Sequence, residues 1–407
     1  MNQKNRKPAI RFKAFNDPWE QRKLAEIGDI VTGSTPSTQR PEYYSEDGIP
    51  WVTPTDITNA PIKDSQKKLS ELGAKVGRVV PAKSILVTCI ASIGKNALLE
   101  ISGSFNQQIN ALIPNQQKYF PYFLFTESHH WSNKMKRKAA AGTMQIVTKK
   151  EFSCIATYVP KLAEQIIIGK LFEELDQLIT LHQRKLDKLQ NVKKACLEKM
   201  FPQNGESVPR IRFKGFTDTW EQCKFKNLAL IERGGSPRPI EDFITTDSNG
   251  LNWVKIGDAP ELGRYITSTE EKIRPEGLSK TREVHPGDLV LSNSMSFGKP
   301  YIMGIDGCIH DGWLLIRLNK NCDLKYFCHL LGSEGMLKQY RAFAAGSTVN
   351  NLNKQLVSEA IISLPKKEEQ GEIGEFFEQL DNLITLHQRK LDKLKNLKKA
   401  CLEKMFV

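Results

Sequence analysis

Two Gly-Lys pairs come nearest to a phosphate-binding motif in this chain. They stand in SIGK at 92–95 and in SFGK at 296–299. A phosphate-binding loop of the form G-x-x-x-x-G-K-[ST] also needs an earlier glycine and a following Ser or Thr, and both are missing here. The sequence also contains no motif of dinucleotide-binding proteins, serine hydrolases, zinc proteases or amino-methyltransferases. It therefore indicates a binding protein without catalytic apparatus.

Polar residues in loops offer a different chemistry, the reading of DNA bases. Asn, Gln, Ser, Thr, Lys and Arg carry the donors and acceptors that recognise base edges in the major groove. They gather in four segments of each half of the chain, where a role in loop structure is the alternative for every residue. The candidates are Thr35, Ser37, Arg40, Lys95, Gln107, Gln108, Thr143 and Gln145 in the first half, and Ser236, Arg238, Lys299, His310, Asp311, Thr348, Asn350 and Asn351 in the second.

A basic run, NKMKRKAAAG, stands at 133–142. Such a run predicts contacts to DNA phosphates, and a solvated helix face is an equal alternative. Its four cations are Lys134, Lys136, Arg137 and Lys138.

The charge balance favours a polyanionic partner. Lys and Arg number 59 against 46 for Asp and Glu, a net charge of +13. Nucleic acid fits better than a membrane, because the sequence has neither a run of 18 apolar residues nor the apolar core of a signal peptide. The eight cysteines form no C-x-x-C pair, so we expect reduced, structural thiols and no metal site. These features predict a soluble, cytoplasmic protein.

The chain consists of two tandem copies of about 203 residues. The opening PAIRFKAFNDPWEQ at 8–21 returns as PRIRFKGFTDTWEQ at 209–222. The segment 171–201 returns at 376–406 with 26 of 31 residues identical. Between these ends the two middles diverge and read as mixed α/β, with short β-rich runs such as SILVTCIA at 84–91. Near-identical ends and divergent middles indicate one scaffold that carries two different surfaces.

The repeated ends are helical by their spacing. Apolar residues recur at alternating steps of four and three, which is the pattern of a coiled-coil seam. His182 and Lys193 are polar exceptions on it, and Leu178 and Leu181 widen it, so each helix should bury a broad face. We interpret the seam histidines as hydrogen-bonded to a neighbour rather than as metal ligands. The seam comprises Phe172, Leu175, Ile179, Leu186 and Leu189 in the first copy, and Phe377, Leu380, Ile384, Leu391 and Leu394 in the second.

Each helix should span about 37 residues, or roughly 55 Å at 1.5 Å per residue. Two such helices in one chain most simply pack against each other, and a two-fold relation between the copies makes the pair antiparallel. The alternative is two separate helices, each lying on its own domain.

The sequence resembles the specificity (S) subunits of type I restriction-modification enzymes. The resemblance rests on the openings IRFKAFNDPWEQRKL and IRFKGFTDTWEQCKF and on the joint P-x-x-x-E-Q-x-x-I-G at Pro160–Gly169 and Pro365–Gly374. It rests also on the helical motif L-D-x-L-I-T-L-H-Q-R-K-L-D-K-L, and it covers the whole chain.

This resemblance implies a mixed α+β fold in which two tandem α/β target recognition domains are separated by two long helices that form an antiparallel coiled coil. The whole forms a pseudo-two-fold internal repeat. The expected bounds are 1–162 for the first recognition domain, 163–201 for the first helix, 202–366 for the second recognition domain and 367–407 for the second helix.

The same resemblance implies a function in DNA recognition. Each recognition domain would read one half of a bipartite target in double-stranded DNA, and the helices would space the half-sites. Two modification (M) subunits would dock on the helices and methylate adenine with S-adenosylmethionine, and two restriction (R) subunits would bring ATP and magnesium. No cofactor is expected on this chain itself.

Three other functions compete with this interpretation. A self-contained DNA methyltransferase or nuclease would act without a partner, and the missing catalytic motifs argue against it. A protein that acts through its coiled coil alone leaves the duplicated, divergent middles unexplained. An RNA-binding repeat protein would be expected to carry an RRM-like or KH-like motif, and the sequence has none.

Overall fold

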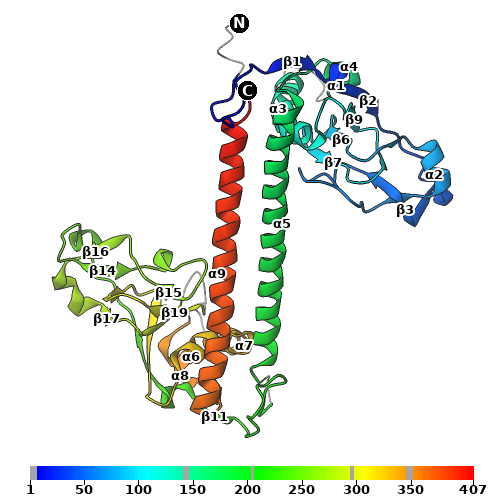
Figure 1. The fold of residues 1–407 in the computed structure, drawn as a ribbon. Helices are drawn as coiled ribbons and strands as arrows, with labels where there is room; N and C mark the ends of the chain where they lie inside the picture. The colour runs from blue at the N-terminus through cyan, green and yellow to red at the C-terminus, as the bar shows by residue number, and fades with distance from the viewer. Residues whose placement is uncertain (1–6, 141–145, 203–205, 294–297, 345–351) are drawn as a thin grey trace. The chain divides into compact units, whose positions relative to one another are not determined.

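The computed structural model describes residues 7–140, 146–202, 206–293, 298–344 and 352–407, and it describes no side chains at 138–140 and 343–344. The chain divides into two compact units (Figure 1). The first comprises Met1–Leu181 with Leu391–Val407, and the second comprises His182–Lys390. Each unit therefore contains one of the divergent middles together with parts of both long helices.

The first unit is built on two four-stranded sheets. Their strand orders are β2-β9-β6-β7 and β4-β3-β8-β5, and the short strands β1 and β10 pair separately. The apolar run SILVTCIA forms the fully buried β6, as its β-branched residues predict. The strands are β1 (Glu20–Lys23), β2 (Gly28–Thr32), β3 (Tyr44–Val52), β4 (Lys68–Leu69), β5 (Val79–Val80), β6 (Ile85–Thr88), β7 (Asn96–Leu98), β8 (Gly103–Phe105), β9 (Ile109–Pro114) and β10 (Ala156–Val159).

The second unit is built on two five-stranded sheets. Their orders are β12-β21-β18-β19-β15 and β13-β16-β14-β20-β17, and β11 pairs with β22. The strands are β11 (Glu221–Lys224), β12 (Ala229–Arg233), β13 (Ile244–Thr245), β14 (Leu251–Val254), β15 (Tyr265–Ile266), β16 (Glu271–Ile273), β17 (Arg282–Val284), β18 (Leu289–Ser292), β19 (Pro300–Met303), β20 (Gly307–Ile309), β21 (Trp313–Leu318) and β22 (Ile361–Leu364).

Helices complete both units. The α-helices are α1 (Leu24–Ile27), α2 (Glu71–Val76), α3 (Pro121–Ala140), α4 (Lys149–Ser153), α5 (Leu162–Lys199), α6 (Leu324–Leu331), α7 (Glu334–Ala344), α8 (Lys354–Glu359) and α9 (Lys367–Lys404). The 3₁₀ turns are η2 (Pro41–Tyr43), η3 (Phe225–Asn227), η4 (Ile240–Asp242), η5 (Ile256–Asp258) and η6 (Pro275–Lys280).

The two units share one topology. The order β2-β9-β6-β7 reappears as β12-β21-β18-β19, with the same antiparallel pairings. In the other sheet β3 runs parallel to β8, and β14 runs parallel to β20 at the corresponding place. The mixed α/β fold and the internal repeat predicted from the sequence are confirmed.

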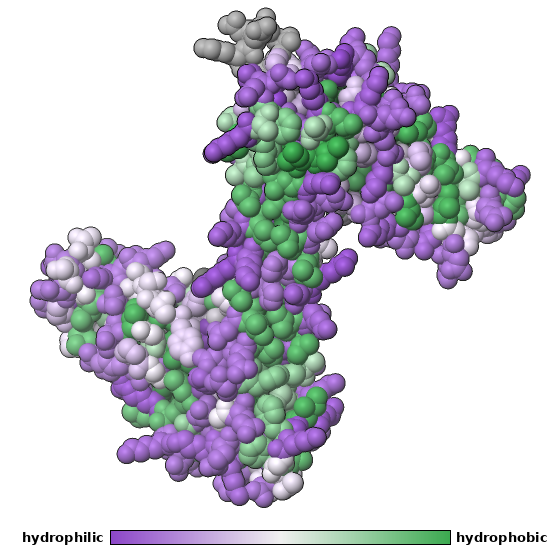
Figure 2. Space-filling view, in the orientation of Figure 1, coloured by the Kyte–Doolittle hydropathy of each residue, from purple (hydrophilic) through white to green (hydrophobic). Residues whose placement is uncertain are grey.

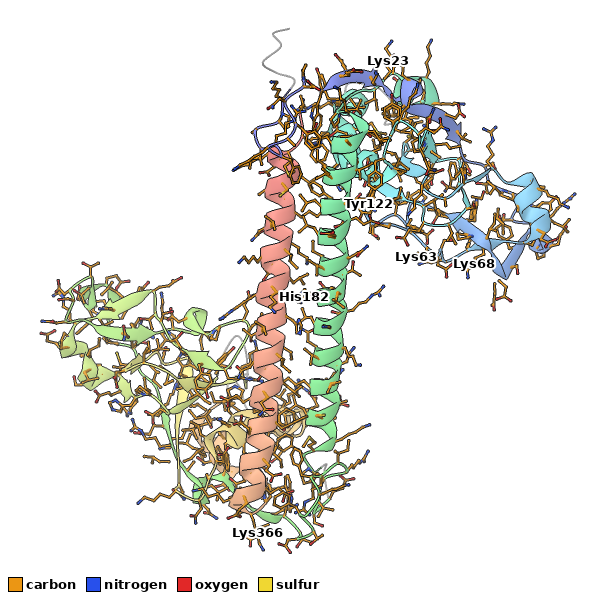
Figure 3. The ribbon with its side chains drawn as sticks, in the orientation of Figure 1. Lys23, Lys63, Lys68, Tyr122, His182 and Lys366 are labelled. Atoms are coloured by element: carbon orange, nitrogen blue, oxygen red, sulfur yellow. The ribbon has the colours of Figure 1, made fainter. Side chains whose placement is uncertain are left out.

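The long helices α5 and α9 run antiparallel in the second unit. His182 of α5 meets His387 of α9 with 2.8 Å between their Nδ1 atoms, one nitrogen donating and the other accepting (Figure 3). Farther along the same helix, Lys193 of α5 donates a hydrogen bond to Asp381 of α9. Because residue numbers rise along α5 while those of its partners fall along α9, the two helices run in opposite directions.

The first unit shows the same arrangement with its own parts of the two helices. Asp176 of α5 accepts a hydrogen bond from Lys398 of α9 at 2.5 Å between Oδ1 and Nζ. Phe172, one turn earlier on α5, lies against Phe406 just beyond the end of α9, with ring centroids 5.6 Å apart. The antiparallel coiled coil predicted from the sequence is confirmed, and the alternative of two separate helices is excluded.

The seam residues show how these helices pack. Seven of the ten are at most 7% exposed, and Ile179, Leu189 and Leu394 are partly buried. Lys193 also lies on the seam, where its side chain is only 14% exposed and pairs with Asp381. The apolar stripe is therefore interrupted by paired polar side chains at fixed places, a pattern that specifies register in coiled coils. The seven well-buried residues are Phe172, Leu175, Leu186, Phe377, Leu380, Ile384 and Leu391.

The repeated opening and the repeated joint bind each other within each unit. Arg11 donates two hydrogen bonds to Glu164, at 2.6 and 2.7 Å, and Arg212 forms the same pair with Glu369. Both glutamates are 1% exposed, and a carboxylate so deeply buried requires a partner of opposite charge. The arginine of IRFK and the glutamate of the joint therefore recur together in both copies because they form one structural link.

The glutamine and glycine of the joint have equally specific roles. Gln165 donates from Nε2 to the Pro160 carbonyl at 2.8 Å and accepts at Oε1 from the Phe120 amide at 3.0 Å. A Cβ at Gly169 would lie 2.4 Å from the Phe120 ring, so a larger residue does not fit without movement. The joint thus fastens the sheets of the first unit to the start of α5.

Candidate DNA-recognition surfaces

Two polar loops meet at one edge of the sheets in the first unit. The Ser34 amide donates to the Phe105 carbonyl at 2.9 Å, and Trp51 donates from Nε1 to the Ser34 carbonyl at 3.1 Å. These bonds hold the loop after β2 beside the loop between β8 and β9. Thr35 and Gln107, both exposed, are joined by a side-chain hydrogen bond. Two segments far apart in the sequence therefore form one exposed polar surface.

Other candidates in this region make short-range contacts. Gln108 accepts from Asn106 at Oε1, 3.1 Å away. Arg40 donates from Nη1 to the Tyr43 hydroxyl at 2.9 Å and lies over the Tyr43 ring. Ser37 is exposed in the same loop as Arg40. Arg40 and Ser37 remain accessible to a ligand, while the Gln108 carboxamide is partly engaged in loop structure.

The corresponding loops of the second unit form a charged cluster around Asp311. Ser236 donates to Oδ1 of Asp311 at 3.0 Å, and His310 places Nε2 3.0 Å from the same oxygen. Arg238, whose side chain is 82% exposed, reaches within 3.7 Å of Oδ2. Asn293 donates to the Asp311 carbonyl at 2.9 Å. The four candidates from two loops are thus brought together, and the exposed guanidinium extends from this cluster into solvent.

The two Gly-Lys pairs form matching turns. The Lys95 amide donates to Thr88 Oγ1 at 3.0 Å, and the Lys299 amide donates to Ser292 Oγ at 2.9 Å. The glycine before each lysine has a positive φ, 85° and 74° respectively, a conformation that favours glycine. The motif is therefore explained by the turn between β6 and β7 and by its counterpart in the second unit. Both lysine side chains are exposed.

The basic run lies along the end of α3. Lys134 donates from Nζ to the Ala156 carbonyl at 2.7 Å, so this ammonium is already engaged. Lys136 and Arg137 are exposed and free to meet a phosphate. The remaining candidates lie outside the described residues, or in the case of Lys138 outside the described side chains: Lys138, Thr143, Gln145, Thr348, Asn350 and Asn351.

Two arginines next to these loops were not among the sequence candidates. Arg78 donates from its amide to Ser34 Oγ at 3.0 Å and from Nη1 to the Thr32 carbonyl at 3.3 Å. Arg233 donates from Nε to the Asp311 carbonyl at 3.3 Å. Arg233 directly precedes GGSPRP, so its position in the sequence gave a usable signal, whereas Arg78 reaches its loop only through the tertiary fold.

The thiols and other potential ligands offer little chemistry. All eight cysteines are unpaired, and burial raises the pKa of Cys89 and of Cys308 to about 12. Such thiols stay protonated and unreactive at neutral pH. Within the described residues no three His, Cys, Asp or Glu side chains gather as metal ligands. In the same part of the chain no helix has the length and apolar character needed to cross a membrane.

The long helices expose apolar residues at matching positions. Leu178 and Leu181 of α5 are 43% and 47% exposed, and their counterparts Leu383 and Leu386 of α9 are 44% and 46% exposed. Residues three apart share a helix face, so each pair forms one apolar patch. The expectation that these residues widen the buried stripe is wrong for the chain by itself, since the partner helix covers only the seam. Figure 2 shows apolar side chains on the surface of both helices.

Comparison with known proteins places this architecture in a family. The family model described as "Type I restriction modification DNA specificity domain" matches the chain twice, over residues 16–191 and 217–396. The chain belongs to this family. The resemblance to type I S subunits that the sequence motifs indicated is thereby confirmed.

Individual relatives agree with this assignment to the type I DNA specificity family. The chain is 31% identical over 147 residues to the type I restriction enzyme HindI specificity subunit of Haemophilus influenzae, a match that covers 35% of this chain and 32% of the relative. It is 27% identical over 239 residues to the MjaIX specificity subunit of Methanocaldococcus jannaschii, covering 56% and 55%. These two matches span less than two thirds of the relatives' own length.

A solved structure matches over a greater length. The crystal structure of a type I restriction-modification system S subunit from M. genitalium has a TM-score of 0.66 at 12% identity, and the match covers 98% of this chain and 99% of that one. At this identity the likeness concerns the fold. It shows that the arrangement of two mixed domains with a long helix in each half is shared with a solved S subunit.

Proposed function

We propose that this chain is the DNA specificity subunit of a type I restriction-modification complex and acts on double-stranded DNA in the cytoplasm. In this proposal each unit reads one half of a bipartite target. The observation that carries it is the contrast between the two units. Their sheets share one order, yet the corresponding loops carry the neutral pair Thr35–Gln107 in one and the charged Asp311 cluster in the other. Equal frames with different donors and acceptors suit two different base sequences.

The exposed leucines support docking of two M subunits. Leu178 with Leu181, and Leu383 with Leu386, form apolar patches of nearly equal exposure at corresponding places of the two copies. Two copies of one partner require two equivalent surfaces, and an internal repeat supplies them. Exposed apolar patches on an otherwise charged helix are typical of protein–protein contacts.

In the proposed complex this chain binds DNA and catalyses no reaction itself. The M subunits bind S-adenosylmethionine and methylate adenine, and two R subunits supply the ATP- and magnesium-dependent restriction activity. The chain would therefore carry no cofactor of its own, and its helices would set the distance between the half-sites.

A methylation map tests this function. Methylated adenines are mapped genome-wide in cells that carry the complete system and in cells from which this chain alone has been deleted. We expect a bipartite motif whose methylation disappears with the chain. A methylation pattern that is identical in both maps would contradict the proposal.

The docking surfaces can be tested by native mass spectrometry of the chain co-expressed with its M subunit. The unchanged chain should form a complex of two M subunits to one S subunit. Leu178→Glu with Leu181→Glu should leave one M subunit bound, and the matching pair Leu383→Glu with Leu386→Glu should give the same result. If both variants still bind two M subunits, docking uses another surface.

A self-contained methyltransferase or nuclease is the alternative function. Purified chain incubated with labelled S-adenosylmethionine or with magnesium and plasmid DNA should transfer no methyl group and cut no DNA. Activity of the chain without partners would favour the alternative.

A further inference from the structure

The aspartate of the repeated L-D-x-L-I-T motif is a meeting point of three elements in the first unit. Asp176 lies on α5 and accepts at Oδ1 from Lys398 of α9, 2.5 Å away. Its other oxygen, Oδ2, accepts from the Tyr122 hydroxyl at 2.9 Å. Tyr122 lies on α3, one of the helices of the first recognition domain (Figure 3). One carboxylate therefore joins both long helices to that domain.

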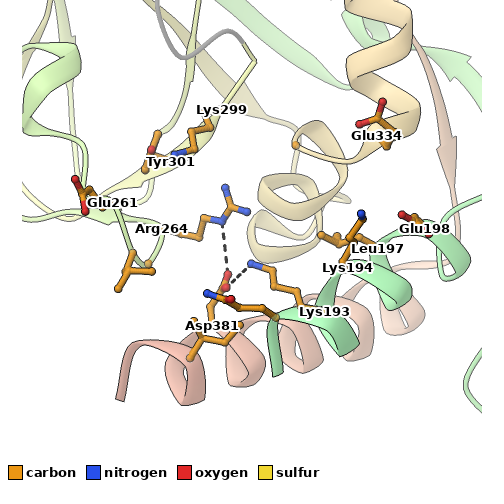
Figure 4. Close-up of a pocket in the computed structure, with 15 residues that line it drawn as sticks. Lys193, Lys194, Leu197, Glu198, Glu261, Arg264, Lys299, Tyr301, Glu334 and Asp381 are labelled. Carbon is orange, nitrogen blue, oxygen red and sulfur yellow. Dashed lines mark hydrogen bonds and ion pairs between the residues drawn. The ribbon is translucent and has the colours of Figure 1, made fainter. Parts of the chain in front are cut away.

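The corresponding aspartate of the second unit does the same with different partners. Asp381 lies on α9 and accepts from Lys193 of α5. Its Oδ2 lies 3.5 Å from Nε of Arg264, which directly precedes β15 in the second recognition domain (Figure 4). The lysine again comes from the opposite helix and the third group again comes from the recognition domain. That third group is a cationic guanidinium here and a neutral hydroxyl in the first unit.

Both clusters are largely shielded from water. The side chains of Asp176 and Lys398 are each 17% exposed, and those of Asp381 and Arg264 are 12% and 19% exposed. Hydrogen bonds and ion pairs that are partly withdrawn from water are stronger than fully exposed ones. They therefore add to the apolar packing a link that depends on how the domain is turned against the helices.

The second cluster also carries a surplus positive charge. Lys193 and Arg264 face the single carboxylate of Asp381, and the pKa of Lys193 is lowered, first by burial and then by Arg264. His329 of α6 places Nδ1 3.9 Å from Asp381, and burial together with the two cations lowers its pKa too. The Asp381 carboxylate thus lies between Lys193 and Arg264, and its removal would leave these two cations facing each other.

We propose that Asp176 and Asp381 are positioning residues, each of which helps to fix the orientation of one recognition domain on the two helices. Asp176 acts through Tyr122 in the first unit, and Asp381 acts through Arg264 in the second. This inference rests on the proposed function, because its consequence concerns the gap between two half-sites.

The consequence follows from DNA geometry. One extra base pair in the gap moves a half-site by about 3.4 Å and turns it by roughly 35° around the duplex axis. The protein can follow such a change only if a recognition domain shifts on the helices, and this shift breaks its link to the aspartate. The energy of that link is therefore part of the penalty against a gap of the wrong length. It has no part in distinguishing one base from another.

Two substitutions remove these links and leave the helix pairing intact. Tyr122→Phe removes only a hydroxyl from a buried ring, and Arg264→Gln removes the guanidinium while the Lys193–Asp381 pair stays. Arg264→Lys keeps the charge and serves as the conservative variant. Arg317→Gln is the matched control, because Arg317 forms an arginine–aspartate pair with Asp288 entirely within the second recognition domain, at 3.1 Å.

The test measures binding of the complex of this chain with its M subunits to three duplexes. They carry the motif selected by the unchanged complex from a random pool, with its gap unaltered, one base pair shorter and one base pair longer. A fourth duplex with one altered half-site base measures base discrimination. We expect Tyr122→Phe to reduce the preference for the correct gap by about two- to tenfold, the range for loss of one hydrogen bond. Arg264→Gln removes an ion pair and should reduce that preference by about two- to fivefold. Base discrimination should stay unchanged, and Arg264→Lys should restore part of the gap preference.

The outcomes distinguish a failure of the proposed spacing function from a failure of the positioning role. If the unchanged complex shows no preference for gap length, the proposed spacing function fails and this inference fails with it. If the unchanged complex shows the preference and both variants retain it, the positioning role alone is refuted. A parallel loss of gap and base discrimination, or an equal loss in Arg317→Gln, would indicate a general structural defect and would also refute it.

Discussion

Phe406→Ala should destabilise the first unit far more than a change two residues beyond the end of a helix usually does. The side chain is 6% exposed. Its ring lies 5.6 Å from the centroid of Phe123 in a stacked arrangement, 6.0 Å from Trp19 edge to face, and 5.6 Å from Phe172. The substitution therefore opens a cavity between the repeated opening, α3 and α5. A buried phenylalanine replaced by alanine costs about 3–5 kcal/mol of unfolding free energy.

Phe201 provides the matched control in the second unit. It follows α5 as Phe406 follows α9, it is 3% exposed, and it packs on Tyr326 and Phe377 with ring centroids 5.6 and 5.8 Å apart. Phe201→Ala should therefore cost a similar amount, but in the second unit. Comparison of the two variants tests whether the stability of each unit depends on the end of a helix that begins in the other copy of the repeat.

Hydrogen exchange followed by mass spectrometry locates the effect. A loss of about 3–5 kcal/mol accelerates exchange of the most protected amides by roughly 150- to 5,000-fold. In Phe406→Ala this acceleration should appear in β6 and β9 of the first unit, and in Phe201→Ala in β18 and β21 of the second. Equal acceleration in both units for either variant, or none in the unit named, would refute the packing argument.

Three further outcomes are expected. Arg212→Ala leaves the buried carboxylate of Glu369 on α9 without its partner and should lower the free energy of unfolding in chemical denaturation by about 3–5 kcal/mol. An effect below about 1 kcal/mol would show that this carboxylate finds another partner. Burial, the neighbouring imidazole of His182, Lys185 and Lys390 all lower the pKa of His387, so the helix pair is fully stabilised above about pH 6.5 and loses this stability as the pH falls toward the folded-state pKa. Replacing both histidines by Gln should therefore reduce the loss of stability on acidification. An unchanged pH profile of stability would contradict this. Insertion of seven residues at matching places in the middle of both long helices preserves the heptad phase and lengthens each helix by about 10 Å. In a methylation map the gap between the half-sites should then grow by roughly three base pairs, with the half-sites unaltered. An unchanged gap with full activity would mean that the helices do not set the spacing.

Much of the scaffold could be predicted from the sequence because the repeat supplies its own internal comparison. The heptad spacing identified both long helices, and the two-copy pattern predicted their antiparallel pairing. The pairing of Arg11 with Glu164 was not foreseen, although both belong to motifs that recur together. Such links join residues more than 150 positions apart, and sequence spacing carries no signal for contacts of that range.

The reading surfaces were less predictable, and for a physical reason. Loop residues were selected by type, and the fold determines which of them remain accessible: Lys134 is engaged by a carbonyl, while Arg238 extends into solvent. Lys193 was recognised in the sequence as a polar exception on the seam, and the fold turns its side chain toward Asp381. The seam position was visible in the heptad pattern, whereas the aspartate that accepts its hydrogen bond lies on the other helix.

The most direct test of the central claim, that each divergent middle reads one half of the target, is an exchange of one middle. Residues 22–160 are replaced by the corresponding segment of a related specificity subunit, and methylated adenines are mapped genome-wide in cells that carry the complete system. One half of the bipartite motif should change, while the other half should stay as in the unchanged chain. A change in both halves, or in neither, would contradict it.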